Sequence, residues 1–239
     1  MRALTLPSAH LAIAAAALVI AASPASAITY LGPTPYLQFA DSPFSGGAFD
    51  YFHLEDFEDG ALNTPGLSSP AGIVVTPSAT IDSVDEDVGG VDGSGANGHS
   101  YYADRNENTL IFIFDAVTLG SLPTHAGVVW TDVGFNTSQD VTFQAFDAGD
   151  NPLGLFGPFT LGDASVSGET DEDRFFGAIH GPGISRIEIS MPGSVDWEVD
   201  HVQYGRQAHV DVAAPAAAAL IPAGLIGLGF VARRRSRHA

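Results

Sequence analysis

Short apolar runs that break off at glycine, proline, asparagine or aspartate are the feature that most limits how this chain can fold. Between residues 28 and 212 these runs alternate or are continuously apolar, and no segment has the period of an amphipathic helix. The runs lie at residues 36–39, 51–57, 72–76, 99–102, 109–115, 127–132, 141–147, 153–161, 174–180, 184–191 and 197–204. Many short strands at this spacing predict an all-β domain, a jelly-roll-like β-sandwich. The chain has no cysteine, so its core alone must hold the fold.

The first 27 residues have the three parts of a secretory signal peptide. Arg2 is the basic region, residues 11–22 are the apolar run, and Ala25-Ser26-Ala27 is a small-residue cleavage pattern. The apolar run is shorter than the roughly 20 residues that a retained membrane helix needs. We therefore expect a signal helix that is cleaved after Ala27, and export of a domain at residues 28–212.

The last segment, residues 213–239, joins an apolar stretch to a cluster of arginines. As a helix, residues 216–232 would be about 26 Å long, enough for a thin bilayer. Arg233, Arg234 and Arg235 follow at once, and positive charge holds the end of a span in the cytoplasm. The pattern predicts a single C-terminal transmembrane helix that leaves the β-domain outside.

This tail resembles the PEP-CTERM and VPLPA-CTERM sorting tails, in which a proline motif precedes an apolar span and an arginine cluster. The motif here is Ala213-Ala214-Pro215-Ala216, which departs from the family pattern because no glutamate follows Pro215 and no leucine separates two prolines. The resemblance implies processing by an exosortase in the inner membrane of a Gram-negative bacterium that makes exopolysaccharide, and a final place at the cell surface or outside it. Blocks such as LEDFEDG from Leu54 and VDHVQYG from Val199 also resemble uncharacterised ectodomains that carry this tail.

The distribution of charge excludes one class of partner. The chain has nine arginines and no lysine, and only four of the arginines lie between residues 28 and 212. All 28 acidic residues lie between Asp41 and Asp211. Phosphate backbones and anionic lipids are bound through positive charge, so nucleic-acid binding is not expected. Two uses of the acidic residues remain open, which are solubility and the binding of a divalent cation.

Calcium takes roughly six to eight oxygen ligands, and acidic residues in three places could supply them. The candidate ligands are Glu55, Asp56 and Glu58 near the end of an early strand, Asp85 and Asp87 in the long irregular segment 83–100, and Asp200 in the last strand. By resemblance to jelly-roll carbohydrate-binding modules, which often hold a structural calcium between an early acid and one on the final strand, Glu58 and Asp200 are the central pair. An EF-hand loop from Asp85 is excluded, because Gly89 and Ala96 stand where ligands are needed.

A secreted glycan-acting hydrolase is the competing function. Such enzymes use two carboxylates, and Glu198 and Asp200 would point to one face of a strand. The sequence Trp197-Glu198-Val199-Asp200 resembles the Glu-x-Asp core of laminarinase-like sandwiches, although the further glutamate of that pattern is missing.

The sequence as a whole predicts an exported, acidic, non-enzymatic protein of the cell surface or extracellular matrix that is stabilised by calcium. Polysaccharide is a candidate ligand, because Trp130, Trp197, Tyr101 and Tyr102 could form a stacking platform for sugars. Packing in the core is the alternative use of these rings. A matrix component that binds nothing small is a third interpretation.

Overall fold

The computed structural model describes residues 27–103, 107–133, 139–162, 168–194 and 197–208. In these ranges the chain is all-β, with three short helical elements. The strands are β1 Thr29–Pro35, β2 Phe49–Glu55, β3 Leu67–Ser68, β4 Ile73–Val74, β5 Tyr101–Ala103, β6 Thr109–Phe114, β7 His125–Val133, β8 Gln139–Phe146, β9 Pro152–Leu161, β10 Arg174–Ile179, β11 Arg186–Ser190 and β12 Trp197–Gln207. The helical elements are the 3-10 turns η1 Phe39–Asp41 and η2 Asp85–Val88, and the single-turn helix α1 Ala116–Leu119.

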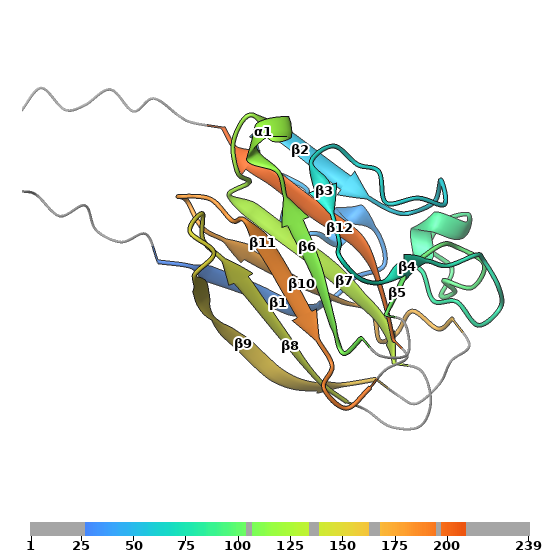
Figure 1. Ribbon diagram of the computed structural model, residues 1–239. Coiled ribbons are helices and arrows are strands. Elements are labelled where there is room, and N and C mark those ends of the chain that lie inside the picture. The colour runs from blue at the N-terminus through green and yellow to red at the C-terminus, as the bar shows by residue number, and fades with distance from the viewer. Residues whose placement is uncertain (1–26, 104–106, 134–138, 163–167, 195–196, 209–239) are drawn as a thin grey trace, which may run out of the picture.

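The strands form two antiparallel sheets that pack as a β-sandwich (Figure 1). The larger sheet has the order β1-β10-β7-β12-β5-β4, and β2 also pairs with β12. The smaller sheet has the order β3-β6-β11-β8-β9. The prediction of an all-β sandwich is confirmed, whereas the jelly-roll connectivity stays a prediction.

The main core fills the space between the sheets. Alternate residues of β6, β8 and β11 meet alternate residues of β7, β10 and β12 there, as the two-residue period of a strand requires. Trp130, Trp197 and Tyr101 are buried in this core, and the Trp130 indole donates to the sulfur of Met191 at 3.0 Å. Tyr102 is half-buried. Core packing is therefore what the structure shows for three of the four aromatic residues that could have formed a sugar platform.

The larger sheet is covered on its outer face as well. Val128 and Phe176 belong to the main core, whereas their chain neighbours Val129 and Phe175 point the other way and pack with Tyr36 in a second apolar cluster, which also holds Phe44 and Val84. The segments 36–48 and 75–100, which supply Tyr36, Phe44 and Val84, lie over this face. Strands buried on both faces are nearly continuously apolar.

One extra residue in β12 changes which side chains reach this outer face. The register of β12 against β7 shifts between Asp200 and Gln203, and His201 has a φ of 43°, as in a β-bulge. Because of the bulge, Val199 and Val202 both enter the main core although they are three positions apart. His201 is left beside Asp200, away from that core.

The N-terminal end of the domain differs from the sequence prediction. The sequence predicts a strand at residues 36–39, but these residues lead into η1. The first strand is instead β1, which the sequence does not predict because its Gly32-Pro33 pair is typical of a turn. Proline removes a ladder hydrogen bond and is tolerated at a sheet edge, which is where β1 lies. Residues 36–39 instead lie over the outer face of the larger sheet, where Tyr36 packs in the second apolar cluster.

Other predictions concern residues that the structure does not describe. The predicted sorting tail at 213–239, with Pro215, Arg233, Arg234 and Arg235, lies outside the described residues, as does the predicted signal peptide up to residue 26. Among the residues that are described, no helix has the length and apolar character needed to cross a membrane. The two described ends of the chain lie on one side of the sandwich, and the segment 75–100 lies toward the other (Figure 1).

Candidate metal centre

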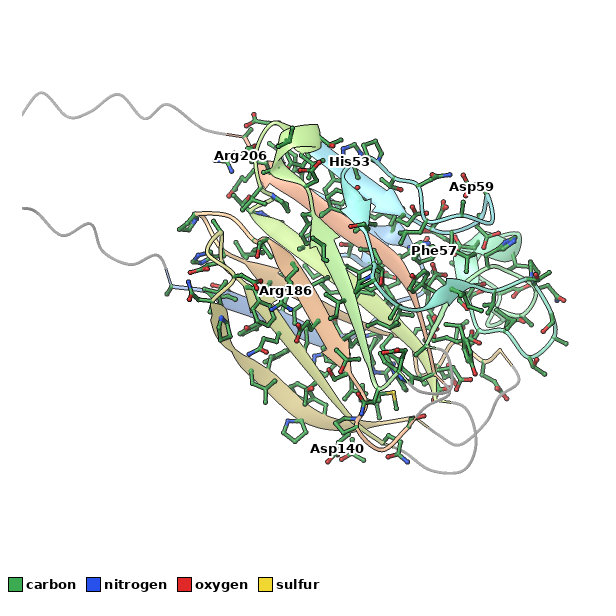
Figure 2. The ribbon with its side chains drawn as sticks, in the orientation of Figure 1. His53, Phe57, Asp59, Asp140, Arg186 and Arg206 are labelled. Atoms are coloured by element: carbon green, nitrogen blue, oxygen red, sulfur yellow. The ribbon has the colours of Figure 1, made fainter. Side chains whose placement is uncertain are left out.

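Acidic residues are concentrated on the outer face of the larger sheet, beneath the segment 75–100. Seven carboxylates there are less than a tenth exposed, namely Asp82, Asp85, Asp132, Glu172, Asp173, Glu198 and Asp200. The described residues include three arginines, Arg174, Arg186 and Arg206, and among them the charge of Arg174 opposes the effect of burial, which raises the pKa of Asp173. Figure 2 shows Arg186 and Arg206 toward the end of the sandwich that carries the two chain ends, away from Asp59. The guanidinium of Arg174 donates to the backbone carbonyl oxygens of Asp171 and Asp173.

Two acids of β12 hold the segment 75–100 in place. Glu198 accepts hydrogen bonds from the backbone N–H of Asp82 at 2.9 Å and from the hydroxyl of Ser100 at 2.7 Å. Asp200 accepts one from the backbone N–H of Val84 at 2.9 Å. The segment also folds back on itself, because Ser83 bonds the carbonyl oxygen of Gly95 through both its N–H and its hydroxyl. The long irregular segment is therefore an ordered cover over the sheet.

Asp82, Asp132 and Glu172 form the first of two clusters, which we call the carboxylate cluster. One ligand oxygen of each lies within 4.8 Å of the other two. The three come from separate parts of the chain: Asp82 from the segment 75–100, Asp132 from the end of β7, and Glu172 from the turn before β10. Asp82 Oδ1 is fully buried and has no hydrogen-bond partner. This arrangement leaves a buried carboxyl oxygen that the polypeptide does not satisfy.

Asp173 extends the same acidic layer. The residue is 0% exposed, and neither of its carboxylate oxygens has a hydrogen-bond partner. Burial first, and then the charges of Asp82 and Glu172, hold the pKa of Asp173 well above its ordinary range. Burial, followed by the charges of Asp132 and Glu198, likewise raises the pKa of Asp82 to about 10. Both raised pKa values mean that ionising a further carboxyl group in this layer costs free energy.

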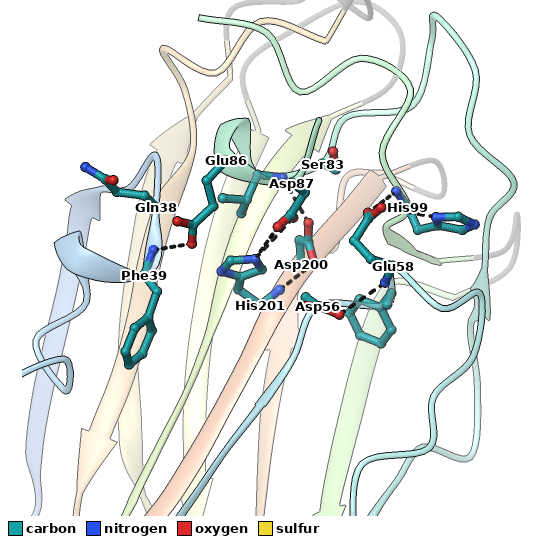
Figure 3. A network of polar contacts seen from close by, with 12 residues as sticks. Gln38, Phe39, Asp56, Glu58, Ser83, Glu86, Asp87, His99, Asp200 and His201 are labelled. Carbon is teal, nitrogen blue, oxygen red and sulfur yellow. Dashed lines mark hydrogen bonds and ion pairs between the residues drawn. The ribbon is translucent and has the colours of Figure 1, made fainter. Parts of the chain in front are cut away.

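Asp87, Asp200 and His201 form the second cluster, which we call the histidine cluster (Figure 3). His201 Nε2 lies 3.0 and 3.1 Å from the two carboxylate oxygens of Asp87. Asp200 is fully buried, and it accepts the backbone N–H of His201 in addition to that of Val84. Burial, and then the charge of Asp87, raise the pKa of Asp200 well above its usual value. Asp200 therefore keeps a proton at pH values where a solvated aspartate is ionised.

A chain of buried hydrogen bonds fixes the proton on His201. Gln203 Nε2 donates to the hydroxyl oxygen of Tyr36 at 2.8 Å, and Ser42 donates to the other end of the Gln203 amide. The Tyr36 hydroxyl can then donate to His201 Nδ1, which lies 2.8 Å away. Because Nδ1 accepts, the ring proton is on Nε2 and points at Asp87. Every group in this cluster has its partner within the protein.

The residues predicted from the sequence as metal ligands are dispersed. Glu55 accepts the backbone N–H groups of Phe57, Asn63 and Thr64 and the Thr64 hydroxyl, so its carboxylate closes a turn. Asp56 accepts the backbone N–H of Glu58.

Two further predicted ligands also have structural partners. Glu58 accepts the backbone N–H of His99 (Figure 3), and burial raises its pKa. Asp85 accepts the backbone N–H groups of Asp92 and Gly93 within the segment 75–100. Although burial acts in the opposite direction, these bonds lower the pKa of Asp85. Of the six predicted ligands, the structure brings only Asp87 and Asp200 together, in the histidine cluster.

The pair proposed for glycan hydrolysis, Glu198 and Asp200, lies under the cover. Their side chains are 5% and 0% exposed and accept hydrogen bonds from the segment 75–100. A polysaccharide cannot reach either carboxylate while that segment is in place.

Comparison with known proteins adds little to this geometry. No protein-family model matches the chain, and no curated protein matches it. Among solved structures, the catalytic domain of a GH87 alpha-1,3-glucanase in complex with tetrasaccharides is similar at 16% identity and a TM-score of 0.35. The match covers 71% of this chain, which spans only 30% of that structure.

Proposed function

We propose that this chain is an exported, acidic, non-enzymatic protein of the cell surface or extracellular matrix, whose β-sandwich is stabilised by calcium. The sorting tail at residues 213–239 would deliver it, and polysaccharide is its candidate partner. The observation that carries the proposal is the layer of buried carboxylates beneath the segment 75–100, with little positive charge to balance it. A buried ion needs a counter-ion or a proton, and an oxygen-only set of donors suits calcium.

Thermal unfolding of the purified chain tests this function. The melting temperature is measured in excess chelator, in calcium and in magnesium at equal ionic strength. An ion that binds only the folded state at a hundred times its dissociation constant adds about 2.7 kcal/mol. We expect a clear rise in calcium and a smaller one in magnesium. Equal melting temperatures in calcium and in chelator would contradict the calcium-stabilised function.

A glycan-acting hydrolase is not favoured by any contact that the structure describes, because Glu198 and Asp200 hold the cover. Glu198→Gln offers a check on this alternative. Loss of glycan hydrolysis with an unchanged calcium response would support the enzyme.

A further inference from the structure

We propose that a single calcium ion is bound by the carboxylates of Asp82, Asp132 and Glu172, and that it fastens the segment 75–100 to the larger sheet. This inference rests on the calcium-stabilised function proposed above and names the atoms that carry it. It differs from the sequence prediction, which placed the ion at Glu58 and Asp200.

The geometry of the carboxylate cluster suits one ion. Calcium–oxygen distances are about 2.3–2.6 Å, so two ligands of one ion lie no more than about 5 Å apart. The three oxygens all lie within 4.8 Å of one another. Asp173, next to Glu172 in the chain, has two more buried oxygens without hydrogen-bond partners. The acidic layer thus has carboxylate oxygens to spare for a calcium shell.

Hydrogen bonding separates this cluster from the histidine cluster. Asp200 accepts two backbone N–H groups, and His201 is bonded on both ring nitrogens. By contrast, Asp82 Oδ1 is buried and no donor reaches it. An unsatisfied buried acceptor is expensive, and one that carries charge is more so. A cation at this position supplies what the polypeptide does not.

The donor set decides the class of ion. The carboxylate cluster offers only oxygen, whereas zinc and other transition metals prefer histidine and cysteine. All three side chains are less than a tenth exposed, which leaves little access for the several waters that magnesium keeps. Calcium accepts a shell made mostly of carboxylates. The ion would join three segments that are far apart in the sequence, and would thereby hold Asp82 and its neighbours against the sheet.

Asp82→Asn tests the assignment, with Asp50→Asn and Asp87→Asn as matched controls. Asp50 is an exposed residue of β2, and Asp87 belongs to the histidine cluster, so each control makes the same substitution elsewhere. Calcium binding is measured by titration calorimetry on the chelator-treated chain, and stability by thermal unfolding with and without calcium. We expect Asp82→Asn to weaken calcium binding by about tenfold or more and to abolish the rise in melting temperature. Both control variants should keep the calcium affinity of the natural chain and its rise in melting temperature.

The chelator-treated proteins show whether Asp82→Asn still folds. Asparagine at position 82 cannot add negative charge to the acidic layer, so the melting temperature of this variant in chelator should be equal to or above that of the natural chain. Glu172→Gln is the second variant if Asp82→Asn does not fold. Hydrogen exchange adds a readout at the cover, because the amides of Ser83 and Gly95 are bonded within or beneath it and should exchange more slowly in calcium.

Each remaining outcome overturns the assignment in a distinct way. If Asp87→Asn, rather than Asp82→Asn, removes the calcium response, the ion lies in the histidine cluster. If all three variants keep it, calcium binds elsewhere and the proposed function survives without this site. If the natural chain shows no calcium response, the site and the calcium-stabilised function fail together.

Discussion

The two buried acidic clusters both lie where the segment 75–100 covers the larger sheet, but their carboxyl groups are stabilised in different ways. In the histidine cluster, burial raises the pKa of Asp200, which accepts two backbone N–H groups, and His201 donates to Asp87. In the carboxylate cluster, Asp82 Oδ1 has no donor. Burial of acids is thus common to both, and their hydrogen bonds and their ligand atoms distinguish them. The comparison teaches that a candidate metal site is better selected by what its oxygens lack than by the number of its acids.

The difference follows from where the backbone of the cover points. At Val84 the N–H is directed at Asp200, whereas the N–H of Asp82 is directed at Glu198. The Asp82 side chain faces Asp132 and Glu172, and no donor reaches its Oδ1. Within one segment, Val84 thus donates to the carboxyl group of Asp200, whereas Asp82 itself has a carboxyl oxygen without a donor.

The pH dependence of stability should expose the carboxylate cluster once calcium is removed. Between pH 7 and 9 the unfolded chain has released the proton of Asp82, whose ordinary pKa is 3.8, while the folded chain still holds it. The contribution of this proton is complete below pH 3.8 and is lost as the pH rises toward about 10, the folded pKa of Asp82. In chelator, the free energy of unfolding should therefore fall by up to about 1.4 kcal/mol per pH unit for this proton, and the raised pKa values of Asp173 and Asp200 act in the same direction. Denaturant titrations at pH 7 and pH 9 measure it.

Calcium should reduce this fall, because the ion takes the place of the protons. The lowered pKa values of His53 and His125 make stability rise with pH, but only below their ordinary value of 6.5, outside the chosen range. A free energy of unfolding that is constant or rises from pH 7 to 9 in chelator would contradict the account of Asp82.

Two substitutions of Asp200 separate hydrogen bonding from charge in the histidine cluster. Asp200→Asn imitates the protonated acid and keeps one acceptor, whereas Asp200→Ala leaves the N–H groups of Val84 and His201 without one. We expect the alanine variant to be less stable than the asparagine variant by about 1–3 kcal/mol in urea titrations. The calcium response should persist in both. A lost response in the asparagine variant would move the ion to this cluster and end the contrast.

Glu58→Gln should have the smallest effect, although Glu58 was a central ligand of the sequence prediction. Its Oε1 accepts the backbone N–H of His99, and glutamine keeps that acceptor. We expect the free energy of unfolding to change by less than about 0.5 kcal/mol, and calcium affinity measured by calorimetry to be unchanged. Markedly weaker calcium binding would restore the sequence-based site.

The sequence predicted most strands of the two sheets, because β8 and β11 alternate apolar and polar residues and β6 is a continuous apolar run. It missed the two-residue strand β3, and it missed β1, whose Gly32-Pro33 pair has the composition of a turn. It also treated β12 as regular, so that Glu198 and Asp200 shared a face but His201 did not. The bulge at His201 is a property of pairing with β7, and a single strand read in isolation does not reveal it.

The candidate site was harder to predict than the fold. Asp132 and Glu172 lie in strand-end and turn positions with no spacing that links them to Asp82, because three distant segments meet only in the folded chain. Asp200 and Asp87 were selected for their carboxylates, and the structure gives them a histidine as third partner. The sequence held one signal for Asp132, which is its place at the end of the apolar run of β7. A carboxylate at such a place is either buried or lies at the end of a sheet.

The place of β12 in the larger sheet has a consequence for the order of assembly. This strand is the last described in the chain, and yet it lies between β7 and β5 rather than at an edge. Its Glu198 and Asp200 bond residues that precede them by 116 positions. A chain that ends before residue 197 would contain Asp82, Asp132 and Glu172 but lack the strand that seats the cover. Long-range pairing of this kind forms slowly. The proposed calcium site would therefore close late, and an ion bound there would stabilise a finished sandwich instead of nucleating it.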